Sequence, residues 1–156
     1  MTVLVLDHPK LLAQNAFPAA GGGSNDTPKR PHRLRFHYGF NQHRLNQEDQ
    51  ALLRQHALWL THNPAACLHI HGHSDVFGVG EYNQFLSRLR ARSAAKLMIN
   101  EGARESQIIT TGWGSARPLA RPEDHAANRR LELEYLSMDM AEALSVYLEY
   151  IPEQQK

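Results

Sequence analysis

The stretch from Cys67 to Arg90, CLHIHGHSDVFGVGEYNQFLSRLR, predicts a strand, a loop and a helix in succession. Its first residues alternate between apolar and histidine side chains, which is the pattern of a strand with one buried face. Gly78 and Gly80 then interrupt the pattern, and helical spacing begins at Glu81. Asp75 therefore lies on the loop that joins the strand to the helix.

The helix that follows is expected to carry a polar line beside its apolar face. Asn83 and Arg90 are two turns apart and lie on this line. A carboxylate at Asp75 opposite a guanidinium at Arg90 suits a ligand with one ammonium and one carboxylate. The alternative is that Asp75 caps the helix and Arg90 is one of several solvated arginines. Helical spacing predicts that the buried stripe, with Phe85 on its flank, consists of Tyr82, Leu86, Leu89, Ser93 and Leu97.

Five segments extend this pattern over roughly residues 33–136. In chain order they are RLRFHYGFNQHRL from Arg33, GHSD from Gly72, YNQFLSRLRA from Tyr82, GWG from Gly112 with Pro118 after it, and NRRLE from Asn128. Together they resemble the OmpA-like peptidoglycan-binding domain of outer-membrane proteins, Pal-type lipoproteins and flagellar stator proteins. The chain departs from that pattern at Val76 and Phe77, where the family usually has small polar residues. Phe77 either narrows the ligand range at the mouth of a groove or folds onto the core.

The resemblance implies a ligand and the residues that bind it. The family's ligand is the peptide stem of peptidoglycan, held through meso-diaminopimelate or a similar diamino acid. Asp75 is implied to bind the ammonium, and Arg90 to bind the carboxylate with a planar fork that a lysine lacks. Both side chains are expected to be partly exposed, so that alanine at either position removes binding and leaves folding intact.

Other motif residues are implied to complete the site. The further ligand-binding candidates are Asn83, Leu86 and Arg129, and the residues expected to support the loop are His73 and Ser74. The alternatives are that Leu86 packs the helix and that Arg129 pairs with Glu132. No nucleophile with an adjacent base appears in these motifs, so we expect a non-catalytic module without a cofactor. Its expected role is to anchor an envelope component or assembly to the cell wall.

The whole chain is expected to form one α/β domain (an α+β sandwich) with a tail at each end. Strands are predicted at about 33–38, 67–73, 107–112 and 130–136, with helices from Asn46 to His62 and from Glu81 to Gly102. This β-α-β-α-β-β order packs two helices on one face of a mixed sheet. Residues 1–31 are expected to be a flexible segment, residues 32–136 the OmpA-like domain, and residues 137–156 an extra amphipathic helix and tail.

The role of the C-terminal helix is open in the sequence. Apolar residues over 138–151 lie at helical spacing, which predicts an amphipathic helix. It docks either on the open face of the sheet or on a protein partner or second copy of the chain. This second possibility supports a rival function, in which the domain is a scaffold with an unused groove.

Composition narrows the function classes further. The 156 residues include 17 basic and 16 acidic side chains, so the net charge of +1 gives no reason to expect nucleic-acid binding. The single Cys67 excludes an intrachain disulfide and is expected to be a buried thiol. We expect no signal peptide, because Asp7 and Lys10 break the apolar start, and no transmembrane segment. The resemblance nevertheless implies a periplasmic or envelope location, so the export route stays open.

A rival from another class comes from the histidines of the strand at 67–73. His69, His71 and His73 alternate along one strand face, and this spacing occurs in zinc hydrolases. The match to such enzymes is loose, because the later metal-binding histidines are missing. The sequence therefore offers a weaker alternative of a zinc site on the sheet face away from the helices.

Overall fold

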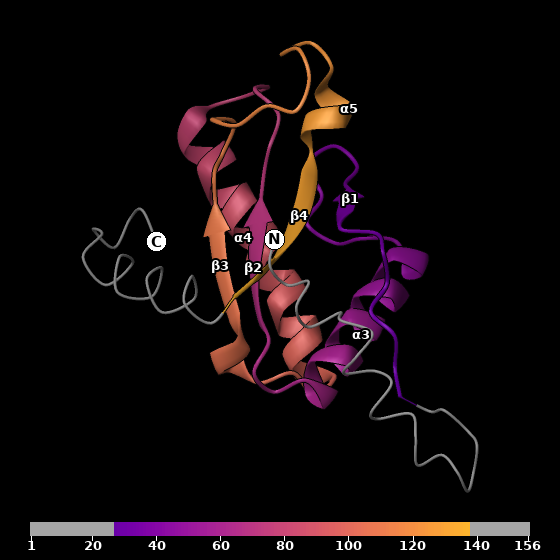
Figure 1. Ribbon diagram of the computed structural model, residues 1–156. Helices are drawn as coiled ribbons and strands as arrows, with labels where there is room; N and C mark the ends of the chain where they lie inside the picture. The colour runs from indigo at the N-terminus through magenta and orange to yellow at the C-terminus, as the bar shows by residue number, and fades with distance from the viewer. Residues whose placement is uncertain (1–26, 138–156) are drawn as a thin grey trace, which may run out of the picture.

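A computed structural model of the protein describes residues 27–137 (Figure 1). Four strands form one mixed sheet in the order β1-β4-β2-β3. Strands β2 and β3 are parallel, whereas β4 is antiparallel to both β1 and β2. In chain order the elements are β1 (Arg35–His37), α3 (Gln47–His62), β2 (Cys67–Gly72), α4 (Gly80–Asn100), the 3₁₀ helix η2 (Glu105–Gln107), β3 (Ile108–Gly112), α5 (His125–Asn128) and β4 (Arg130–Leu136).

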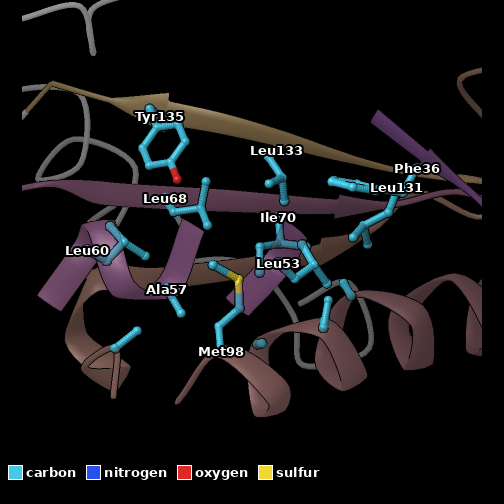
Figure 2. Close-up of a cluster of buried hydrophobic side chains, with 14 of the residues drawn as sticks. Phe36, Leu53, Ala57, Leu60, Leu68, Ile70, Met98, Leu131, Leu133 and Tyr135 are labelled. Atoms are coloured by element: carbon cyan, nitrogen blue, oxygen red, sulfur yellow. The ribbon is translucent and has the colours of Figure 1, made fainter. Parts of the chain in front are cut away.

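The predicted fold class is confirmed. Helices α3 and α4 pack on one face of the sheet, and their apolar side chains meet those of β2 and β4 in a single core (Figure 2). Two short elements were not predicted, namely η2 and α5. Strand β1 is also shorter than the predicted 33–38, because only three of its residues pair with β4.

Local signals define both ends of α3. The Asn46 side chain accepts a hydrogen bond from the backbone N–H of Asp49 at 2.8 Å, so it acts as the predicted N-cap. Glu48 and Asp49 lie in the first turn, where carboxylates interact favourably with the helix dipole. Asn63 ends the helix, and Pro64 follows it.

Helix α4 is rotated relative to the prediction. Its buried face includes Asn83, Ser87 and Arg90, whereas Tyr82 and Phe85 are 45% and 50% exposed. The polar line predicted to border the buried stripe is therefore part of it. The rest of this face comprises Leu86, Ala91, Ala94, Ala95 and Met98.

Two glycines explain this rotation. A Cβ at Gly72 would lie 2.0 Å from the Ser87 carbonyl oxygen, and a Cβ at Gly112 would lie 2.5 Å from Cγ of Arg88. The strands β2 and β3 thus approach α4 at van der Waals distance only because these positions carry no side chain. Small residues of the helix face the sheet there, and the large aromatic residues face outward.

Some expectations concern residues outside the described range. The segment 1–26 and the predicted C-terminal helix over 138–151 both lie outside residues 27–137. Within 27–137, no helix has the length and hydropathy needed to cross a bilayer.

Candidate functional site

A groove of about 260 Å³ lies where four segments of the chain meet. The β1–α3 and β2–α4 loops form two of its sides, α4 forms a third, and the residue before β4 completes it. The structure brings together in this groove all the residues that the sequence predicted for ligand contact, which are Asp75, Asn83, Leu86, Arg90 and Arg129. Phe77 also lines the groove and is exposed, which agrees with the first of its two predicted alternatives, a place at the groove mouth. The other lining residues, which the prediction omitted, are Phe40, Asn41, Gly78 and Tyr82.

Arg90 joins the two loops through backbone carbonyl groups. Its Nε donates a hydrogen bond to the Gln42 carbonyl at 2.8 Å, and its Nη1 donates to the His73 carbonyl at 2.7 Å. The guanidinium also lies 4.6 Å from the centre of the Tyr38 ring, within the range of a cation–π contact. Its Nη2 is buried and has no hydrogen-bond partner.

The expected partial exposure of Arg90 and Asp75 is wrong. Arg90 is 0% exposed and Asp75 is 6% exposed. Burial lowers the pKa of Arg90 to about 10, against opposing contributions from Tyr38 and Asp75, and the guanidinium therefore stays charged at neutral pH. Replacing Arg90 with alanine would leave two carbonyl groups without their donor, so we now expect that variant to be destabilised.

Asp75 is already paired within the groove. Its Oδ1 accepts a hydrogen bond from the backbone N–H of Phe77 at 3.0 Å, which shapes the loop as an Asx turn. Its Oδ2 lies 3.2 Å from Nη1 of Arg129 and 3.6 Å from Nδ1 of His125. Any ammonium that binds Asp75 must share this carboxylate with Arg129.

The Asn128 side chain helps to position Arg129 at the groove. Its side-chain oxygen accepts hydrogen bonds from the backbone N–H groups of Leu119 and Ala120 at 2.7 and 2.9 Å. This fixes the loop between β3 and β4 beside α5. Arg129, the next residue, donates from Nε to the Tyr38 carbonyl at 3.0 Å and so holds the β1–α3 loop as well.

His73 and Ser74 support the loop through their backbones. The N–H of His73 donates to the Arg130 carbonyl at 2.9 Å, and the N–H of Ser74 donates to the Gly114 carbonyl at 2.8 Å. The His73 ring and the Ser74 hydroxyl are buried and have no hydrogen-bond partner. These two residues therefore contact the neighbouring segments through backbone groups and not through their side chains.

The part of the sequence that builds this groove matches a known protein family. The model of the OmpA family matches residues 37–131, from the last residue of β1 to the start of β4. The chain belongs to the OmpA family. This match spans the groove and all five predicted ligand-contact residues.

Curated relatives within the OmpA family are similar over part of their length. The chain is 30% identical over 102 residues to a peptidoglycan-associated lipoprotein of Buchnera aphidicola, a match that covers 64% of this chain and 59% of that protein. It is 30% identical over 101 residues to outer membrane porin F of Pseudomonas aeruginosa, covering 62% of this chain and 29% of the porin.

Solved structures support the same fold. The peptidoglycan-associated lipoprotein of Burkholderia pseudomallei superposes with a TM-score of 0.66 at 29% identity, over 72% of this chain and 98% of that one. The C-terminal domain of Helicobacter pylori MotB superposes with a TM-score of 0.60 at 20% identity, over 76% of this chain and 98% of that domain. At this lower identity, the second likeness concerns the fold alone.

His69 and His71 of β2 lie on the sheet face opposite the helices, as predicted, because the alternating Leu68 and Ile70 belong to the core. The side chains that could bind a metal there are not the three predicted histidines. Among residues 27–137, ligand atoms of His69, His71 and Glu134 lie within 4.8 Å of one another. His73 is not a member of this group, and its Nε2 lies 4.0 Å from Glu132. The structure therefore does not bring the three histidines together as one zinc site.

The hydrogen bonds of His71 fix its tautomer. Its Nδ1 lies 2.8 Å from Nε1 of Trp113, and an indole N–H is only a donor. Nδ1 must therefore be the acceptor, so the proton of the neutral ring is on Nε2, which donates to Glu134 at 2.9 Å. A metal on Nε2 would require the proton to move to Nδ1, where it would face the indole N–H. The donor set does not fit a metal while Trp113 stays in place.

Proposed function

We propose that this OmpA-family domain binds the peptide stem of peptidoglycan without catalysis, through the ammonium and carboxylate at the free end of diaminopimelate. Bound in this way, it anchors an envelope component or assembly to the cell wall. The name of its relatives, peptidoglycan-associated lipoprotein, supports the wall as the target.

The observation that carries the proposal is the state of the Arg90 guanidinium. Two of its nitrogens are fixed on backbone carbonyls, and Nη2 is buried without a partner beside a groove large enough for a small ligand. A buried donor without a partner costs about 1 to 3 kcal/mol, so a bound carboxylate that accepts from Nη2 recovers this energy. The fixed nitrogens hold the guanidinium in position before the ligand arrives.

Asp75 supplies the complementary charge for the ligand's ammonium. It is the carboxylate that lines the groove, and its Oδ2 is held by Arg129. A ligand carboxylate near Arg129 would weaken its ion pair with Asp75 and free Asp75 for the ammonium. A ligand with both charges on one carbon fits this arrangement better than an amine alone.

The test is titration of the protein with muropeptide that contains meso-diaminopimelate, beside lysine-type muropeptide, followed by NMR. Saturable binding of the first and weaker binding of the second is expected. Arg90→Lys should lose binding because a lysine cannot keep both carbonyl contacts and also donate to the ligand. Arg92→Lys, at an exposed position of the same helix, is the matched control and should bind as the wild type does.

Two outcomes would oppose this function. Equal affinity for both muropeptides would remove the role of the ligand carboxylate and hence of Arg90. Binding of neither, by a protein with a folded spectrum, would favour the scaffold with an unused groove. The segment 138–151, which that scaffold would use, lies outside the described residues.

A further inference from the structure

Two exposed phenylalanines form an aromatic rim beside the charged floor of the groove, which consists of Asp75, Arg90 and Arg129. Phe40 from the β1–α3 loop and Phe77 from the β2–α4 loop are each 59% exposed. Their rings meet edge to face with centroids 5.3 Å apart, and both residues line the groove. Two large apolar side chains are thus held at the surface by each other, on two loops that the Arg90 hydrogen bonds join.

The rim does not belong to the core. The core cluster of the described residues contains neither phenylalanine. The neighbouring Val76 and Val79 are also exposed, at 42% and 67%, so the loop that follows Asp75 presents several apolar side chains to solvent. An exposed apolar patch beside a polar site is typical of a surface that binds something.

The chemistry of the rim limits what it contacts. A phenylalanine ring offers no hydrogen-bond donor or acceptor, so it gains from contact with C–H groups and not from contact with charges. The charged groups of the site, Asp75, Arg90 and Arg129, all lie on the floor. A ligand that fits both parts has its charges at one end and a hydrocarbon segment directly next to them.

We infer that Phe77 and Phe40 determine specificity by holding the hydrocarbon arm of the ligand while its charged end lies on the groove floor. This inference rests on the proposed function and adds to it the two side chains that contact the hydrocarbon part of the ligand, an unbranched polymethylene chain that carries the amino-acid end group. In the stem peptide this chain is the side chain of diaminopimelate.

Saturation-transfer NMR with the diaminopimelate muropeptide tests the contact directly, because it reports which ligand protons touch the protein. In the wild type the side-chain methylene protons of diaminopimelate should receive the strongest saturation. Phe77→Ser and Phe40→Ser should each reduce that signal and weaken affinity by about three- to tenfold, the contribution of one aromatic contact. Folding should persist, since both rings are largely exposed.

Phe85→Ser is the matched control. Phe85 is 50% exposed and lies on α4 outside the groove lining, so its loss should change neither the affinity nor the saturation pattern. Wild-type affinity in Phe77→Ser, or strongest saturation on sugar or alanine protons, would overturn the inference and leave the proposed function intact. Absence of muropeptide binding by the wild type would instead refute both.

Discussion

Arg129 lies 3.2 Å from Asp75 across the floor of the groove, although 54 residues separate them in the sequence. The pair is largely buried, with side-chain exposures of 17% and 7%. A carboxylate in such a place needs a cation, and the structure supplies one before any ligand binds. The same contact ties the loop after β2 to the start of β4.

This pairing predicts the effect of Asp75→Asn. The amide oxygen can still accept from the Phe77 N–H, so the loop should keep its shape, but the charge that attracts the ligand's ammonium is lost. We expect at least about a tenfold loss of muropeptide affinity, which corresponds to about 1.4 kcal/mol. Calorimetry measures it, with Asp124→Asn as control because Asp124 lies nearby outside the groove lining. Undiminished binding in Asp75→Asn would contradict the role given to the carboxylate.

The close approach of β2 to α4 predicts that Gly72→Ala is strongly destabilising. The new Cβ would overlap the Ser87 carbonyl oxygen at 2.0 Å, and a backbone atom in a packed helix cannot easily move. We expect a loss of about 3 kcal/mol in the free energy of unfolding, measured by urea denaturation. Gly80→Ala is the control, since a Cβ there meets nothing within 4 Å and Gly80 is the first residue of α4. Equal stability of the two variants would show that the helix can shift.

The tautomer of His71 predicts that Trp113→Phe changes metal binding. Removing the indole N–H lets the ring proton move to Nδ1, so that Nε2 can bind a metal together with Glu134 and His69. The variant should bind Zn²⁺ or Ni²⁺ at least about tenfold more tightly than the wild type, by calorimetry on protein without a histidine tag. Stoichiometric tight binding by the wild type would show that the Trp113 contact does not control the ring.

Buried histidines predict a loss of stability in mild acid. Burial lowers the pKa of His56 to about 4 and the pKa of His69 and His73 to about 3. A histidine in the unfolded chain has a pKa of about 6.5. Below that pH the unfolded chain binds protons that the folded state does not take up, so the free energy of unfolding is highest above that pH and falls below it.

Urea unfolding at pH 7.5 and pH 5 measures this effect. Each such histidine should contribute about 2 kcal/mol to the fall as an upper value. His73→Phe should reduce the fall in stability, because it removes one of the titrating groups. The substitution loses no hydrogen bond, since the His73 ring makes none. The same pH dependence in His73→Phe as in the wild type would mean that His73 is protonated in the folded state.

Much of the fold was predictable because its signals are local. The N-cap at Asn46 and the strand at β2 each depend on residues a few positions apart, and the structure confirms both elements. The single buried face predicted for β2 is wrong, because His69 is buried as well as Leu68 and Ile70. The ordered motifs likewise identified the family, and they selected the five predicted residues that now line one groove. A pattern within one turn or one strand is governed by backbone geometry, which the sequence specifies directly.

The tertiary structure alone decided the rotation of α4 and the environment of the charges. Gly72 and Gly112 set which face of the helix meets the sheet, and so buried Arg90. Arg90 bonds Gln42, Asp75 pairs with Arg129, and His71 accepts from Trp113. The two members of each pair lie 42 to 54 residues apart in the chain, so no local pattern predicts these contacts. Burial and hydrogen bonding then depend on how separate elements pack, and that packing determines which donors are satisfied and which, like Nη2 of Arg90, are left for a ligand.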